Sequence, residues 1–233
     1  MHRTTSSANV VDGKPFSPKA FAALASERLH GTPPAVMTSR HGAGGGVLTP
    51  GPSDFDLNPG HDRDFRPQTG YRTAAVLVPV VARTEPQVLL TQRTSTLSKH
   101  AGQIAFPGGT VDPADGSPRM TALRETEEEI GLTEASIDVL GYLDCYRTGT
   151  GYVITPVVAL VEPGFTLTLN PREVESSFEV PLAFLFNPAN HAIDRRLIQG
   201  RERLFHAMSY QDRYIWGATA GIIRNMYERF LAQ

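Results

Sequence analysis

A cluster of glutamates lies near the middle of the 233-residue chain, at position 125 and at positions 127–129. On a helix, with about 100° per residue, Glu125, Glu128 and Glu129 share one face. The apolar Leu123 and Ile130 then lie on the opposite face. Each like-charged pair four residues apart costs a helix about 0.2–0.5 kcal/mol, so this clustering has no structural benefit. A hard divalent cation reverses that interaction, and oxygen-only ligation favours Mg²⁺ or Mn²⁺ over zinc.

The alternative interpretation is a solvated acidic helix end, which is what a run of charges usually marks. The segment that precedes the cluster argues against it. Phe106 and Pro107 lead into the adjacent glycines Gly108 and Gly109. Because glycine lets backbone groups approach a metal or a phosphate closely, a glycine loop and an acidic helix can face one site.

Apolar runs bounded by turn residues predict the strands that surround this cluster. The predicted strands are 74–82, 88–93, 103–106, 137–146, 152–161, 193–198 and 204–209, with the first two forming a hairpin. Helices are predicted at about 118–130, closed by Gly131, and at about 217–231. This order of elements predicts an α/β (α+β) fold in which a mixed β-sheet is sandwiched between helices.

The first 70 residues differ in texture from the rest. They are rich in Gly and Pro and should be mostly loop. One helix is predicted there, capped by Ser17, with Pro18 at its first position and Gly31 at its end. We therefore expect an N-terminal extension (1–70) and one globular domain (71–233). The extension could cover the site, mediate a homodimer or do neither, and the sequence leaves the three roles open.

Composition and charge exclude several classes of protein. Lys and Arg total 22 against 24 Asp and Glu, so no large positive field favours nucleic acid or a membrane surface as a partner. The longest apolar run, 74–82, is far shorter than the ~20 residues of a membrane helix. Cys145 is the only cysteine, which suits a reducing compartment, so we expect a cytoplasmic protein. Arg3 among Ser and Thr residues weakly resembles an organelle transit segment. An organelle is therefore the alternative to a cytoplasmic location.

The segment 109–132 resembles the box of the Nudix hydrolases, G-x5-E-x7-R-E-U-x-E-E-x-G-U, where U is apolar. Here Gly109 is followed by five residues, Asp115, eight residues and then RETEEEIGL at 124–132. The departures are Asp115 where the box has Glu, one extra residue before Arg124, and Thr126 at an apolar position. The R-E-x2-E-E-x-G-L core at 124–132 is intact. The resemblance implies a Nudix fold and divalent-metal-dependent hydrolysis of a nucleoside diphosphate derivative.

The residues before the box look like the signature of the coenzyme A pyrophosphatase subgroup, L-L-T-x-R-[SA]-x3-R-x3-G-x-V-x-F-P-G-G. The segment 89–109 reproduces its spacing, with Thr94 for Ser or Ala and Ile104 for Val. Ser98 stands where the signature has Arg, which removes a cation from the substrate side, and neighbouring Lys99 is a candidate replacement. The extra residue within the box is usual in this subgroup. The resemblance continues through 151–158, 170–174 and 215–220, and so covers the chain from about residue 71 onward.

The resemblance implies hydrolysis of the diphosphate in coenzyme A and acyl-CoA to 3′,5′-ADP and 4′-phosphopantetheine or its acyl form. It assigns the metal to Glu125, Glu128, Glu129 and the carbonyl of Gly108. It assigns the catalytic roles to Glu125 as the first candidate general base, to Glu128, and to Arg124, which would orient the carboxylates. Glu173, Glu175 and Glu179, on a later predicted loop, are alternative bases.

The substrate-binding candidates are Arg93, Gly109, His100 and Glu173. Arg93 stands at a strand end, and a guanidinium binds phosphate bidentately. His100 could contact a phosphate, and a purely structural role is the alternative. Aromatic residues could stack on adenine or line an acyl channel, but aromatics in strands usually belong to the core. This set is Tyr142, Tyr146, Tyr152, Phe178 and Trp216.

Two further functions remain open. The first is hydrolysis of another nucleoside diphosphate derivative, such as ADP-ribose, NADH or a dinucleotide, which the loss of the signature Arg at Ser98 keeps open. The second is a non-catalytic binding module. Such modules usually lose box carboxylates, and this chain keeps Glu125, Glu128 and Glu129.

Overall fold

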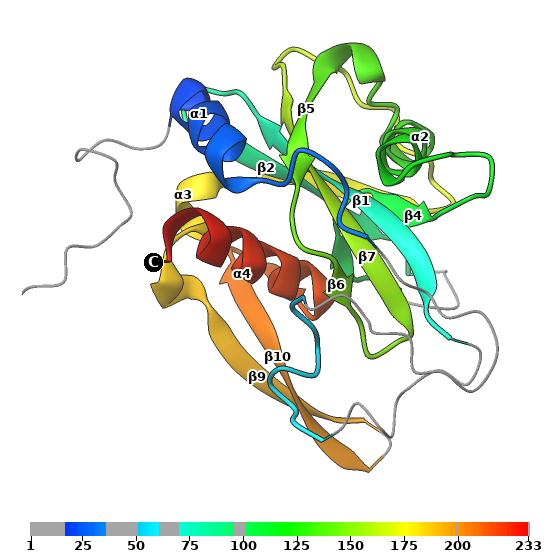
Figure 1. The fold of residues 1–233 in the computed structure, drawn as a ribbon, viewed down its shortest axis with the longest axis vertical. Coiled ribbons are helices and arrows are strands. Elements are labelled where there is room, and N and C mark those ends of the chain that lie inside the picture. The colour runs from blue at the N-terminus through cyan, green and yellow to red at the C-terminus, as the bar shows by residue number, and fades with distance from the viewer. Residues whose placement is uncertain (1–16, 36–50, 61–69, 96–100, 199, 233) are drawn as a thin grey trace, which may run out of the picture.

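A computed structural model describes residues 17–35, 51–60, 70–95, 101–198 and 200–232 (Figure 1). Its helices are α1 (Pro18–Arg28), α2 (Pro118–Ile130), α3 (Leu182–Leu185) and α4 (Ala218–Leu231), with short 3₁₀ turns at Glu134–Ser136 and Pro188–Asn190. Its strands are β1 (Arg72–Val81), β2 (Gln87–Arg93), β3 (Ile104–Ala105), β4 (Gly108–Thr110), β5 (Ile137–Tyr142), β6 (Tyr146–Arg147), β7 (Tyr152–Val161), β8 (Val174–Pro181), β9 (Ala192–Ile198), β10 (Arg201–Tyr210) and β11 (Arg213–Trp216).

The main sheet is mixed, as predicted. Within the described residues it contains eight strands, with the order β3-β2-β1-β7-β5 and with β4, β6 and β8 paired to β1, β7 and β2. β1 and β7 run parallel over their full length, from Arg72 opposite Tyr152 to Val81 opposite Val161. The other pairings are antiparallel, including the β1–β2 hairpin.

Helices cover both faces of this sheet, which confirms the predicted layers. Helix α2 packs Ala122 and Leu123 against Ala75 and Leu77 of β1. Helices α1 and α4 lie on the other face and enclose a second core, as Figure 1 shows. The ends of α2 follow the sequence signals, because the Ser117 hydroxyl accepts from a backbone N–H and Gly131 adopts the left-handed conformation with φ 70°.

Five strands differ from the sequence prediction. β4, β8 and β11 are additional, and the single strand predicted at 137–146 is divided into β5 and β6. The glutamates expected on a loop after residue 170 lie at or in β8, which pairs antiparallel with β2. In β8 only Val174 and Val180 are buried, and polar residues occupy most of the positions between them. This pattern is too weakly apolar to predict a strand from the sequence.

Helix α1 of the N-terminal segment packs into the core that it shares with α4. Helix α1 begins at Pro18 after the Ser17 cap, as predicted, and ends at Arg28, before the expected Gly31. Its Phe21 is fully buried and stacks on Phe230 of α4, with the ring centroids 5.3 Å apart. No helix among the residues described is long and apolar enough to span a membrane.

Candidate active site

The glycine strand β4 lies directly against the acidic face of α2. Gly108 has φ 152°, and a Cβ there would collide with the backbone of Ala75 and Val76. A Cβ on Gly109 would overlap the carboxylate of Glu125. Gly108 therefore requires glycine, and Gly109 leaves room for the Glu125 carboxylate in its observed position. The predicted approach of the glycine segment to the acidic helix is what the structure shows.

Glu129 is the most buried carboxylate of the cluster, with 3% of its surface exposed. Its Oε2 accepts a hydrogen bond from the Gly108 backbone N–H at 3.2 Å, and its Oε1 lies 3.5 Å from Nη1 of Arg93. Burial raises the pKa of Glu129 to about 7, although Gly108 and Arg93 both act to lower it. The negative charge of Glu129 is thus incompletely compensated by its protein neighbours.

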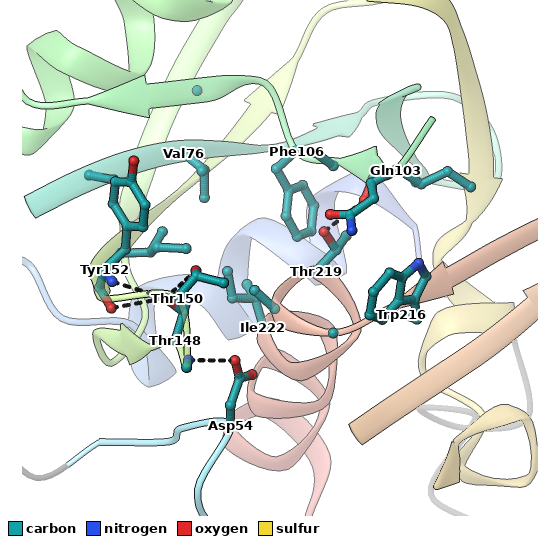
Figure 2. Close-up of a pocket in the computed structure, with 18 of the residues that line it drawn as sticks. Asp54, Val76, Gln103, Phe106, Thr148, Thr150, Tyr152, Trp216, Thr219 and Ile222 are labelled. Atoms are coloured by element: carbon teal, nitrogen blue, oxygen red, sulfur yellow. Dashed lines mark hydrogen bonds between the residues drawn. The ribbon is translucent and has the colours of Figure 1, made fainter. Parts of the chain in front are cut away.

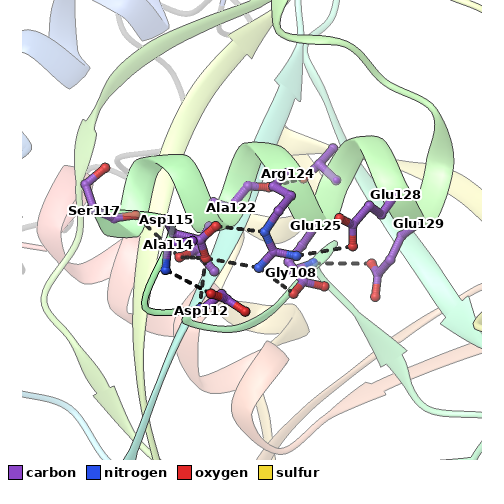
Figure 3. Close-up of polar contacts among 12 residues, drawn as sticks. Gly108, Asp112, Ala114, Asp115, Ser117, Ala122, Arg124, Glu125, Glu128 and Glu129 are labelled. Atoms are coloured by element: carbon purple, nitrogen blue, oxygen red, sulfur yellow. Dashed lines mark hydrogen bonds and ion pairs between the residues drawn. The ribbon is translucent and has the colours of Figure 1, made fainter.

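Arg124 joins the other carboxylates, as Figure 3 shows. Its guanidinium contacts Asp115 at 2.8 and 3.0 Å, Glu125 Oε1 at 2.9 Å and Glu128 Oε2 at 3.2 Å. Burial raises the pKa of Glu125, with Arg124 opposing that shift. Arg124 therefore contacts both carboxylates that it is expected to orient. Asp115, which stands where the box has Glu, anchors the arginine.

The three predicted metal-binding carboxylates share one helix face but differ in setting. Glu129 is buried, Glu125 is half-buried, and the side chain of Glu128 is 56% exposed and turned towards Arg124. Accordingly, no three His, Cys, Asp or Glu side chains of the described residues converge as a metal-ion site. The donor chemistry nevertheless fits a hard cation, since Glu125 and Glu129 supply oxygen ligands and a cation would compensate the buried charge of Glu129.

A cavity of about 950 Å³ opens beside this cluster. The predicted residues that line it are Arg93, Gly108, Gly109, Glu125, Glu129 and Glu173. Arg124 and Glu128 lie outside the lining, and His100 and Ser98 lie outside the described residues. The volume is at the upper end of the range usual for small-molecule sites, about 300–1,000 Å³.

Of the alternative bases, Glu173 is the one in the cavity wall. It precedes β8, and its Oε1 accepts a hydrogen bond from Asn170 at 3.2 Å. Glu175 is exposed on β8, and Glu179 is bound by Arg83 at 2.5 and 2.7 Å. The loop expected to deliver these two glutamates is therefore a strand, and neither of them lines the cavity.

The aromatic residues divide between core and cavity. Tyr142 and Tyr146 are buried, as expected for core residues. Tyr152 and Trp216 instead line the cavity, so the core prediction is wrong for both. Figure 2 shows them on opposite sides of the view with Phe106 between them. Each has an arginine guanidinium 4.2 Å from its ring centroid, Arg72 for Tyr152 and Arg196 for Trp216.

The sequence missed the cavity residues that come from distant segments. They include Asp54, Phe55 and Asn58 of the N-terminal extension and Arg203, Leu204 and Phe205 of β10. Burial raises the pKa of Asp54, against hydrogen bonds from Gly149 and Tyr146 that lower it. No local pattern marks these residues, because their place in the site depends on contacts made after the chain has folded.

Comparison with known proteins identifies related sequences. The profile described as the NUDIX domain matches residues 71–199. "Uncharacterized Nudix hydrolase NudL" of Photorhabdus laumondii is 42% identical over 158 residues, which cover 68% of this chain and 84% of that protein. The protein of the same name from Escherichia coli K12 is 41% identical over 162 residues, or 69% and 84% of the two chains.

Solved structures show a more distant likeness. The match to the crystal structure of DR0079 from Deinococcus radiodurans covers 67% of this chain and 83% of that one. The two have 13% sequence identity and a TM-score of 0.46.

Proposed function

Since the chain belongs to the Nudix family and is a pyrophosphohydrolase, we propose that its substrates are coenzyme A and acyl-CoA, cleaved at the diphosphate. The products are 3′,5′-ADP and 4′-phosphopantetheine or its acyl form. The observation that carries the proposal is the position of Arg93, Gly108 and Gly109, all from the signature segment 89–109, in the same cavity wall as Glu125 and Glu129.

Arg93 supports binding of the diphosphate. It lies at the end of β2 and lines the cavity, and its Nε is buried without a hydrogen-bond partner among the described residues. A buried polar group without a partner is costly, and a phosphate oxygen would satisfy it. Arg93 also lies beside Glu129, so the substrate would be held close to the acidic cluster.

A divalent ion, Mg²⁺ or Mn²⁺, would be held by Glu125 and Glu129, with Glu128 and the Gly108 carbonyl as further ligands. Bound there, such an ion would neutralise charge on the diphosphate and would make an attacking water more acidic. Arg124 holds Glu125 and Glu128 in place through the contacts described above. The protein must also supply a group that accepts the proton lost by the attacking water.

The attacking water adds its oxygen to one phosphorus, the bond from that phosphorus to the bridging oxygen breaks, and the bridging oxygen leaves on the second phosphate. The proton lost by the water passes to a carboxylate. Glu125 is the first candidate for this base, as the family resemblance implies, and it lines the cavity. Glu173 is the alternative that also lines the cavity.

We propose the same division of the chain as the sequence indicates, with residues 71–233 as the hydrolase domain and residues 1–70 as an extension. The start of the matched profile at residue 71 supports this boundary. The packing of α1 and residues 51–60 against the domain supports a role for the extension in completing the site.

The single, buried Cys145 supports a reducing, cytoplasmic location.

The test is a substrate panel with purified protein and Mg²⁺ or Mn²⁺. It compares kcat/KM for coenzyme A, acetyl-CoA, ADP-ribose, NADH and a diadenosine polyphosphate. The highest value for coenzyme A or acetyl-CoA supports the proposal. Preference for ADP-ribose or a dinucleotide would favour the alternative that Ser98 keeps open. Absence of turnover with every compound and both metals would favour a non-catalytic binding module.

A further inference from the structure

The cavity continues from the carboxylates of α2 to a second wall built by the N-terminal extension. Here Asp54 accepts hydrogen bonds from the Tyr146 hydroxyl and the Gly149 backbone N–H, each at 2.8 Å. Figure 2 shows the Asp54 carboxylate reaching the turn beside Thr148 and Thr150. The extension is thereby fixed to the turn at 148–151, which joins β6 to β7.

Asn58 fixes the same extension to β10. Its Nδ2 donates to the carbonyls of Leu204, at 2.8 Å, and of Asp54, at 2.7 Å. Its Oδ1 accepts from the Leu204 backbone N–H at 2.9 Å. The two bonds to Leu204 set the position of β10 relative to residues 51–60. They therefore also set the position of Arg203, the residue that precedes Leu204.

Two arginines of this wall border the turn at 148–151. Arg72 donates its backbone N–H to the Gly151 carbonyl at 3.0 Å and places its guanidinium over Tyr152. Nη1 of Arg203 lies 2.7 Å from the point that a Cβ of Gly149 would occupy. Both arginines line the cavity. Gly149 lacks a side chain at the position where Arg203 approaches the turn.

The two regions of the cavity have opposite charge. In the described lining, Glu125, Glu129 and Glu173 accompany one arginine, Arg93, on the α2 side. Around the turn at 148–151, Arg72 and Arg203 accompany one carboxylate, Asp54. The α2 side suits a cation that faces the diphosphate. The opposite side has a net positive charge and suits an anionic group of the same ligand.

We propose that Arg203 and Arg72 form a second anion-binding subsite, which takes a phosphate monoester that the substrate carries apart from its diphosphate. The inference rests on the proposed function, under which that group is the 3′-phosphate of coenzyme A. A guanidinium presents a planar pair of donors that matches phosphate oxygens. The subsite makes Arg203 a specificity-determining residue, and its position depends on the N-terminal extension through Asn58.

The test compares coenzyme A with dephospho-CoA, which differs only in lacking the 3′-phosphate. The variants are Arg203→Gln and Arg72→Gln. The matched control is Arg201→Gln, which makes the same charge change on β10 at an exposed position outside the cavity lining. Loss of a charge-assisted hydrogen bond should lower kcat/KM for coenzyme A by about 10- to 100-fold in Arg203→Gln. The value for dephospho-CoA should stay within about twofold, and the control should match the wild type for both compounds.

An equal loss for both compounds in Arg203→Gln would overturn the subsite and make Arg203 a structural partner of Asp54. Failure of the wild type to cleave either compound would overturn the proposed function, and the subsite with it. Turnover of both compounds without discrimination would overturn the subsite alone. These outcomes separate the two claims.

A binding measurement covers the case in which the variant loses activity because it folds poorly. Calorimetric titration compares 3′,5′-ADP with 5′-AMP, which lacks the second phosphate. The wild type should bind 3′,5′-ADP more tightly, and Arg203→Gln should lose this preference while it still binds 5′-AMP. Arg203→Lys, which keeps the charge without the planar pair of donors, should retain part of the preference. Equal affinities for the two nucleotides in the wild type would contradict the subsite.

Discussion

Arg124 holds Asp115 through two parallel contacts, Nε to Oδ1 at 2.8 Å and Nη2 to Oδ2 at 3.0 Å. The same guanidinium contacts Glu125 at 2.9 Å. Asp115 also accepts a hydrogen bond from the Thr121 hydroxyl at 2.7 Å and so connects the loop before α2 to the helix itself. The aspartate that departs from the box thus holds the arginine that contacts Glu125 and Glu128.

Replacing Asp115 by Asn should lower the free energy of unfolding at pH 7 by about 1–3 kcal/mol, the cost of breaking a charge-assisted pair. The hydrogen bonds from Arg124 hold the pKa of Asp115 well below its ordinary value of 3.8. A carboxyl with a lowered folded-state pKa stabilises the fold fully above the ordinary value and loses that effect as the pH falls towards the folded-state value. The difference between wild type and variant should therefore be smaller at pH 3 than at pH 7.

Urea denaturation at the two pH values measures this difference. The matched control is Asp138→Asn, since Asp138 is exposed on β5. The control should change the stability by less than about 0.5 kcal/mol at pH 7. A difference between wild type and Asp115→Asn that grows towards pH 3 would contradict the ion pair with Arg124.

Replacing Glu129 by Gln should lower kcat/KM by at least about 10²-fold, the scale of losing an electrostatic group that acts on developing charge. The Mn²⁺ affinity should fall in parallel, because an oxygen ligand has lost its charge. Glu127→Gln is the control, since Glu127 is exposed on the same helix. Enzyme assays and Mn²⁺ titration calorimetry measure both effects. Full activity in Glu129→Gln would remove the metal assignment.

Replacing Gly109 by Ala should displace the carboxylate of Glu125, with which the new methyl group would overlap. A displacement of about 1 Å at a catalytic group can cost 10²-fold in rate. We therefore expect a folded protein with a loss of activity of that order. Gly31→Ala is the control, because a Cβ there meets no atom within 4 Å. Equal kcat/KM for the two variants would show that Glu125 does not need its observed position.

Replacing Phe21 by Ala should lower the free energy of unfolding by about 3–5 kcal/mol, the usual cost of removing a buried aromatic ring. Phe21 is fully buried and stacked on Phe230, so α1 is expected to unfold together with the catalytic domain. Lys19→Ala, at an exposed position of the same helix, is the control. Urea denaturation measures the free energy of unfolding, and a single transition is expected if α1 and the domain unfold together. A change in Phe21→Ala as small as in Lys19→Ala would show that α1 is dispensable for the fold.

Local sequence signals predicted the parts of the fold whose causes are local. Ser117, Pro118 and Gly131 set the ends of α2, and the apolar run at 74–82 indicated β1. The strands β4 and β8 were missed because glycine has low strand propensity and because β8 is mostly polar. Their pairing with β1 and β2 supplies the stability that their own sequences do not indicate.

The same distinction holds for the candidate site. The acidic face of α2 and its approach to Gly109 follow from helical spacing and from the glycine pair. The cavity wall that contains Asp54 and Arg203 does not, because it joins segments far apart in the chain. The hydrogen bonds between Asn58 and Leu204, for example, span 146 residues. Such contacts depend on the whole fold, and no local pattern predicts them.

The most direct test of the proposed function is the identity of the bond that breaks in coenzyme A. The purified protein is incubated with coenzyme A and Mn²⁺, and the products are resolved by chromatography. Hydrolysis at the diphosphate should give 3′,5′-ADP and 4′-phosphopantetheine in equal amounts, with neither product formed by Glu129→Gln. Release of inorganic phosphate with dephospho-CoA, or intact coenzyme A under conditions in which the wild type cleaves ADP-ribose, would contradict it.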